Sequence, residues 1–150
     1  AVCMAFSKQK NLLGGSFTNG EIFSIDLNNK NVTTMDEKHS RVENVIFNPS
    51  GTLLASSSVD KTIRVFDLQR KNSKAILLRN LGSKIRCFVF ANDHQLIAGL
   101  ESDQFYFWEL SSDEIAKTLS SRIVRNMTQD EWVKYIGNEI DYQKTCPSLK

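Results

Sequence analysis

The chain of 150 residues has little of what cross-links or breaks a backbone: 3 Cys, 2 Pro and 7 Gly. The odd number and wide spacing of Cys3, Cys87 and Cys146 argue against both a disulfide framework and a zinc site. Cys3 and Cys87 are expected to be small buried apolar residues. Unpaired thiols favour a reducing, cytoplasmic setting.

Long apolar runs and an excess of one charge are also missing. No run approaches the ~20 apolar residues of a membrane-spanning helix, and the N-terminus does not resemble a signal peptide. The net charge is only +2, and no basic cluster marks a nucleic-acid footprint. We therefore expect neither a membrane nor a nucleic acid as partner. Because Ala1 falls inside a predicted strand, we expect the chain to be part of a longer protein.

Three short strand-like runs occupy residues 42–68. The turn residues Asn-Pro-Ser-Gly at 48–51 and Val-Asp-Lys at 59–61 separate them. Residues 62–68 then alternate Ile63 and Val65 with Arg64 and Phe66. Alternation bounded by turn formers predicts antiparallel β-structure.

The same pattern recurs before and after this stretch. A phenylalanine ends the first strand of each unit at Phe6, Phe47 and Phe90, with spacings of 41 and 43 residues. An acidic residue ends the third strand at Asp26, Asp67 and Glu109, with spacings of 41 and 42 residues. Hairpin turns are predicted at 19–20, 60–61 and 102–103, and Asn19-Gly20 favours a two-residue type I′ turn.

Units of about 40–45 residues with four strands each are typical of propeller blades. We predict an all-β fold in residues 1–110: a partial ring of about three blades of four antiparallel strands, at about 1–40, 41–83 and 84–110. Fourth strands are predicted at 31–35 and 75–79, but the third unit lacks one. A blade is buried on both faces, so the first strands should be apolar almost throughout, with Asn44 and Arg86 as exceptions.

The repeats resemble the WD-repeat family, whose Trp-Asp dipeptide corresponds to Ile25-Asp26, Phe66-Asp67 and Trp108-Glu109. The family forms a buried hydrogen-bonded set from a His, a second-strand Ser, a turn Asp and the Trp. The resemblance implies structural roles for His39, Asp60, Phe66 and Trp108, with Ser56 or Ser58 as the serine. Phe66 cannot donate an indole N–H, so the set is truncated.

After Leu110 the spacing becomes helical. Residues 111–114 have the Ser-x-x-Glu form of a capping box, and a helix is predicted over about 112–124. Thr128 is the predicted N-cap of a second helix that contains Trp132 as a packing anchor and stops at Gly137. Residues 111–150 are thus a two-helix extension that is predicted to pack on the propeller. Within it, the stretch 125–132, followed by Tyr142 and Thr145-Cys146-Pro147, resembles the terminal extension that closes many bacterial WD-repeat proteins.

The resemblance also implies a function. Loops at one rim of such propellers commonly carry partner contacts, which here correspond to Arg41, Glu43, Lys61, Lys84 and Asp103. We expect a non-enzymatic protein–protein interaction scaffold or sensor, the C-terminal part of a larger bacterial signalling or effector protein. Its expected partners are proteins, together with the rest of the propeller or a second copy that pairs with the strand at 104–109.

No catalytic residue, metal site or cofactor is predicted. Cys146 with His39 or His94 would be a conceivable nucleophile and base, but nothing around them supports the pairing. The alternative is an enzymatic or small-ligand propeller with a site in its central channel. Such a site needs several polar residues that converge on the mostly apolar first strands.

Overall fold

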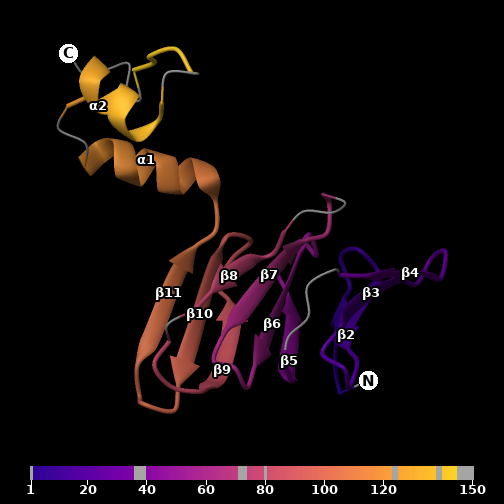
Figure 1. Cartoon of the computed structure of the whole chain (residues 1–150). Helices are drawn as coiled ribbons and strands as arrows, with labels where there is room; N and C mark the ends of the chain where they lie inside the picture. Colours follow the sequence, from indigo (N-terminus) through magenta and orange to yellow (C-terminus); the bar gives the residue numbers. More distant parts are fainter. Residues whose placement is uncertain are drawn as a thin grey trace. The chain divides into compact units, whose positions relative to one another are not determined.

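A computed structural model describes residues 2–35, 40–70, 74–79, 81–122, 125–137 and 140–144 (Figure 1). The chain divides into two compact units, Ala1–Leu110 and Ser111–Lys150. In the described residues, the first unit contains three antiparallel sheets and the second contains two helices. His39 and Cys146 lie outside the described residues.

The strands follow one another through the three sheets in chain order. The first sheet is β1 (Cys3–Ser7), β2 (Leu12–Ser16), β3 (Ile22–Asp26) and β4 (Asn31–Thr34). The second is β5 (Val42–Phe47), β6 (Leu53–Ser58), β7 (Ile63–Asp67) and β8 (Ile76–Leu78). The third is β9 (Ile85–Phe90), β10 (Gln95–Leu100) and β11 (Phe105–Glu109), in the order β11-β10-β9.

The predicted fold class is confirmed, including the prediction that the third repeat has no fourth strand. Two sheets have four strands in sequential antiparallel order, and the third has three within the part of the chain described here. After β11 the chain enters α1 (Ser112–Arg122), and residues 123–124 of the predicted helix are outside the described ranges.

The predicted type I′ turn at Asn19-Gly20 is wrong. That turn needs positive φ at both central residues, but only Gly20 has it there, at +82°. The Gly20 N–H donates to the Phe17 carbonyl and the Phe17 N–H to the Glu21 carbonyl, which makes a three-residue loop with a bulge. Lys61 and Asp103 occupy the same left-handed position, with φ of +63° and +57°.

The middle sheet is buried on both faces because its strands alternate. Leu54 and Phe66 belong to an apolar cluster shared with the first sheet, whereas Ala55 and Val65 belong to one shared with the third. The gap toward the first sheet is narrow: a Cβ added to Gly14 would lie 2.8 Å from the Phe47 ring. This close approach explains the absence of a side chain at Gly14 in β2.

The outer sheets correct the prediction that first strands are buried throughout. Met4 and Phe6 in β1 are 62% and 56% exposed, and Val89 in β9 is 56% exposed. Cys87 is exposed rather than buried, and Cys3 is half-buried with its sulfur 3.1 Å from the Ser16 hydroxyl. The physical reason is that these side chains face away from the middle sheet, where no further sheet lies among the described residues.

The second unit is organised around α2 (Gln129–Tyr135). Thr128 is its N-cap: the Glu131 N–H donates to the Thr128 hydroxyl, and the Thr128 N–H donates to the Glu131 carboxylate at 2.9 Å. Two guanidinium nitrogens of Arg125 donate to the two oxygens of the same carboxylate, each at 2.7 Å. The helix ends at Tyr135 with Ile136 as its C-cap, and the predicted stop residue Gly137 follows with a φ of +105°.

Trp132 joins the helix to the chain that follows it. The Trp132 indole N–H donates to the Ile140 carbonyl at 2.9 Å, and its ring meets the Tyr142 ring edge-on at 5.6 Å. The Tyr142 hydroxyl in turn donates to the Met127 carbonyl at 2.7 Å. These contacts hold the chain that follows α2 against the helix.

The burial of Phe66 yields a stability prediction. Phe66 is 4% exposed, so Phe66→Ala leaves a cavity and should lower the free energy of unfolding by about 3–5 kcal/mol. Phe105→Ala is the matched control, because Phe105 is 68% exposed. Chemical denaturation of both variants measures the difference, and equal losses would contradict the assigned strand register.

The capping carboxylate yields a pH prediction. Hydrogen bonds from the Arg125 guanidinium, and then from the Thr128 N–H, lower the pKa of Glu131 to about 2. The ionised Glu131 carboxylate therefore stabilises the helix cap fully above the ordinary glutamate pKa. This stabilisation is lost as pH falls through about 2. The pH dependence of the Glu131 carboxyl carbon shift in NMR spectra measures this pKa.

Arg125→Gln should return the pKa of Glu131 toward its ordinary value, because the strongest donor is gone. Lys117→Gln is the control, since Lys117 pairs at 3.9 Å with Glu114 on α1 and not with Glu131. An unchanged Glu131 titration in the Arg125 variant would refute the role given to the guanidinium.

Candidate functional site

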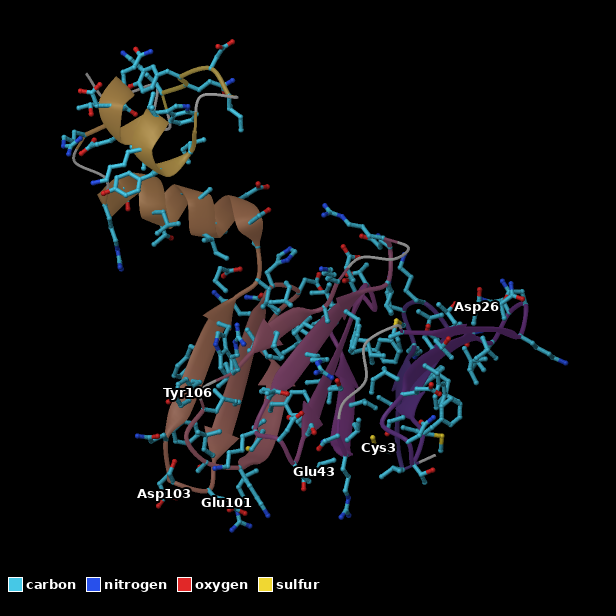
Figure 2. The ribbon with its side chains drawn as sticks, viewed as in Figure 1. Cys3, Asp26, Glu43, Glu101, Asp103 and Tyr106 are labelled. Carbon is cyan, nitrogen blue, oxygen red and sulfur yellow. The ribbon has the colours of Figure 1, made fainter. Side chains whose placement is uncertain are left out.

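The residues predicted for the rim lie at one edge of the sheets. In antiparallel sheets, the start of the first strand and the turn between the second and third strands share an edge. Arg41 and Lys84 precede β5 and β9, and Lys61 and Asp103 lie in the β6–β7 and β10–β11 turns. Figure 2 shows Glu43, Glu101 and Asp103 at this common edge.

Repeated backbone contacts hold the rim. The Val59 N–H donates to the Arg41 carbonyl at 3.0 Å, and the Glu101 N–H donates to the Lys84 carbonyl at 2.9 Å. The Lys61 ammonium donates to the Gly82 carbonyl at 3.1 Å and so joins the second sheet to the segment that enters the third. The rim is therefore built equivalently in neighbouring sheets and linked between them.

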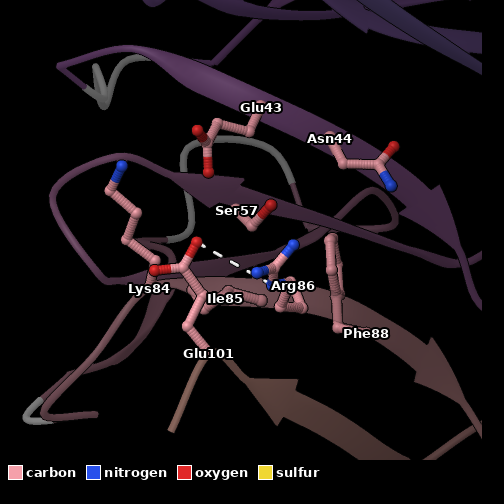
Figure 3. Close-up of a pocket in the computed structure, with 8 residues that line it drawn as sticks. All are labelled: Glu43, Asn44, Ser57, Lys84, Ile85, Arg86, Phe88 and Glu101. Atoms are coloured by element: carbon pink, nitrogen blue, oxygen red, sulfur yellow. Dashed lines mark ion pairs between the residues drawn. The ribbon is translucent and has the colours of Figure 1, made fainter.

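A groove of about 320 Å³ opens at this edge between the second and third sheets (Figure 3). Of the predicted rim residues, it brings together Glu43 and Lys84, whereas Arg41, Lys61 and Asp103 do not line it. The lining residues are Glu43, Asn44, Ser57, Lys84, Ile85, Arg86, Phe88 and Glu101.

The charges of the groove are only weakly satisfied. Arg86 and Glu101 approach to 3.8 Å, and their side chains are 71% and 44% exposed, so this pair contributes little stability. Neither the Glu43 carboxylate nor the Lys84 ammonium has a hydrogen bond or ion pair with another described residue. The groove thus presents acceptors and donors that are available to a ligand.

Sequence reasoning missed Ser57, Arg86 and Glu101 as members of this site. The available signal was the polar interruption of the first strands, since Asn44 and Arg86 are both exceptions to the apolar pattern and both line the groove. Ser57 and Glu101 carry no such signal, because only the pairing of Asn44 with Ser57 and the turn after β10 place them there.

The opposite edge carries a polar lock between the second and third sheets. Asn48 is 2% exposed, and its side-chain oxygen accepts hydrogen bonds from the N–H groups of Thr52 and Leu53, each at 2.9 Å. Its amide nitrogen donates to the Asp93 carbonyl at 3.2 Å, and the Ser50 N–H donates to the Asp93 carboxylate at 2.7 Å. This lock fixes the spacing of the sheets that form the groove.

The residues predicted to be structural have local roles. Asp60 is a turn residue whose carboxylate accepts hydrogen bonds from the Thr62 N–H at 3.1 Å and the Thr62 hydroxyl at 2.6 Å. Trp108 is half-buried against the core and stacks on Tyr106 with ring centroids 5.6 Å apart. Because His39 lies outside the described residues, the predicted hydrogen-bonded set stays a prediction.

The described ranges offer little for other kinds of site. They contain no group of three or more His, Cys, Asp or Glu side chains that could hold a metal ion. Of the two described helices, neither has the length and apolar character needed to cross a membrane.

Antiparallel four-stranded sheets packed face to face in chain order define the blades of a β-propeller. Residues 29–67 match the family model described as "WD domain, G-beta repeat". This segment of the chain is therefore similar to a WD repeat, and solved propeller structures share the fold of the chain. No curated protein matches the sequence.

Two similar solved structures show the fold. The β-propeller domain of Cps50 (Swd1) from Myceliophteria thermophila has a TM-score of 0.63 and 18% identity, covering 75% of this chain and 36% of that one. A chain of the mitotic checkpoint complex has a TM-score of 0.61 and 14% identity, covering 70% of this chain and 32% of that one. The chain thus spans about a third of the length of each structure.

Proposed function

We propose that this chain is a non-enzymatic protein-interaction module that contacts its partner through the rim. WD-repeat propellers generally serve as protein-interaction scaffolds. The observation that carries the proposal for this chain is the rim groove, where Glu43 and Lys84 project charges that no described residue satisfies. Unsatisfied charges held on rigid strands are suited to recognise a complementary protein surface.

The groove's exposed charges support its use as a binding surface. One observation favours the alternative of a small-ligand site: Glu43, Asn44 and Arg86 do converge at one end of the first strands. The groove is however at the small end of the range for ligand pockets.

The proposal extends to the cellular context. We infer the C-terminal part of a larger bacterial signalling or effector protein, in which this module senses or recruits another protein. The short share of each solved propeller that the chain spans supports a larger parent. A cytoplasmic location is part of the proposal, and the free thiols of Cys3 and Cys87 are consistent with it.

Selection from a displayed peptide library against the full chain tests the rim. A selected peptide should lose affinity for Lys61→Glu, because Lys61 lies on the rim, and should bind Lys8→Glu normally, because Lys8 lies in the β1–β2 loop at the opposite edge. Calorimetry measures both affinities. Equal loss in both variants, or none in either, would contradict rim recognition.

The exposed edge of the third sheet implies a second kind of partner. Phe105 and Phe107 on β11 are 68% and 72% exposed, and none of the described strands pairs with the outer edge of β11. An unpaired edge strand with apolar neighbours promotes association. We propose that a strand from the rest of the propeller, or from a second copy, completes this sheet.

Light scattering and hydrogen exchange check this edge. The chain of 150 residues by itself should associate, with fast amide exchange on the outer edge of β11 in any monomer fraction. Phe107→Lys should reduce association, because it places a charge on the exposed apolar face. A monodisperse monomer with slow exchange throughout β11 would refute the missing-strand proposal.

A further inference from the structure

One wall of the rim groove holds a serine hydroxyl. Ser57 is 2% exposed, lies on β6 opposite Asn44, and its hydroxyl makes no hydrogen bond with another described residue. Figure 3 shows the hydroxyl directed into the groove. Because Ser57 lines the groove, its hydroxyl can donate or accept a hydrogen bond there.

Two carboxylates face the same space from different sheets. Glu43 projects from β5, Glu101 follows β10, and in Figure 3 their carboxylates point toward one another across the opening. Glu43 has no described partner, and Glu101 is held only by the loose 3.8 Å contact with Arg86. With Ser57, the groove therefore gathers three sets of oxygen acceptors around one space.

The floor of the groove is apolar and partly aromatic. Ile85 and Phe88, each 7% exposed, line the groove below the charged groups. An apolar floor suits the methylene stem of a long side chain whose charged end stays among polar groups. An aromatic ring also attracts cations and not anions.

From this geometry we propose that the groove receives one cationic side chain, an arginine or lysine, of the protein partner. The head group lies between Glu43 and Glu101 within reach of the Ser57 hydroxyl, and the stem packs on Ile85 and Phe88. Lys84, at one side of the opening in Figure 3, contacts the partner's neighbouring acidic or carbonyl groups. The proposal rests on the proposed rim function and specifies the chemistry of the partner.

Titration of the full chain with short capped peptides tests the charge preference. The probes are acetyl-Gly-Arg-Gly-amide, the same peptide with citrulline as a neutral isostere, and the same peptide with glutamate. Amide shifts of Ser57, Arg86 and Glu101 in NMR spectra are the readout. The arginine peptide should shift these amides, and the citrulline peptide should bind roughly tenfold more weakly, because it lacks the charge.

Glu43→Gln should lower the affinity for the arginine peptide by roughly tenfold, because the substitution removes one charged acceptor. Asp103→Asn is the matched control: it lies on the same rim but does not line the groove, so affinity should be unchanged. Thermal unfolding of both variants checks that the fold is retained, which we expect because both side chains are exposed.

Three outcomes would overturn the proposal: equal binding of the arginine and citrulline peptides, tighter binding of the glutamate peptide, or no effect of Glu43→Gln. The peptide selected from the library shows whether the cationic site or the rim function has failed. If that peptide still depends on Lys61 while the arginine probe ignores Glu43, the rim function stands and the cationic site is wrong. If the arginine probe depends on Glu43 but no selected peptide depends on the rim, the cationic site stands and the partner proposal fails.

Discussion

Burial of the middle sheet on both faces is the constraint on which the rest of this structure depends. Leu54 and Phe66 pack toward the first sheet, and Ala55 and Val65 pack toward the third. Since β-strand side chains alternate between faces, the same four strands supply two apolar cores at once. A slip of one residue in the register would exchange the two faces and place each residue in the wrong core. This constraint fixes the positions of the outer sheets and, through them, of the rim.

The same packing creates the candidate site, because two sheets held face to face leave a groove where their first strands begin. At the opposite edge, the buried side chain of Asn48 and the contacts of Asp93 hold the two sheets together. At the rim, the loose pair of Arg86 and Glu101 leaves the groove's charges available. The contacts of Asn48 and Asp93 hold one edge rigid, while the groove at the other edge has charged groups available to a partner. Charges held in place before binding suit recognition, because they avoid the entropic cost of ordering on binding.

The extension shows a different balance of forces. No residue of α1 or α2 is buried within the described part of the unit, so polar contacts carry most of its local order. Glu131 serves both the Thr128 cap and the Arg125 guanidinium, and Trp132 and Tyr142 tie the following chain to the helix.

The sequence by itself determined the strands, their period, the three-stranded last sheet and the Thr128 cap, because each follows from local alternation, turn chemistry or capping. It predicted Glu43 and Lys84 on one rim through the resemblance to a family. Tertiary structure alone decided that Ser57, Arg86 and Glu101 join them, since register across β5, β6 and β9 brings these residues together. It also decided that Cys87, Met4 and Phe6 are exposed, because alternation shows that a strand has two faces but not whether another sheet covers each one. The Asn19-Gly20 turn differed for a related reason: loop length is set by where the paired strands end, and one left-handed residue suffices there.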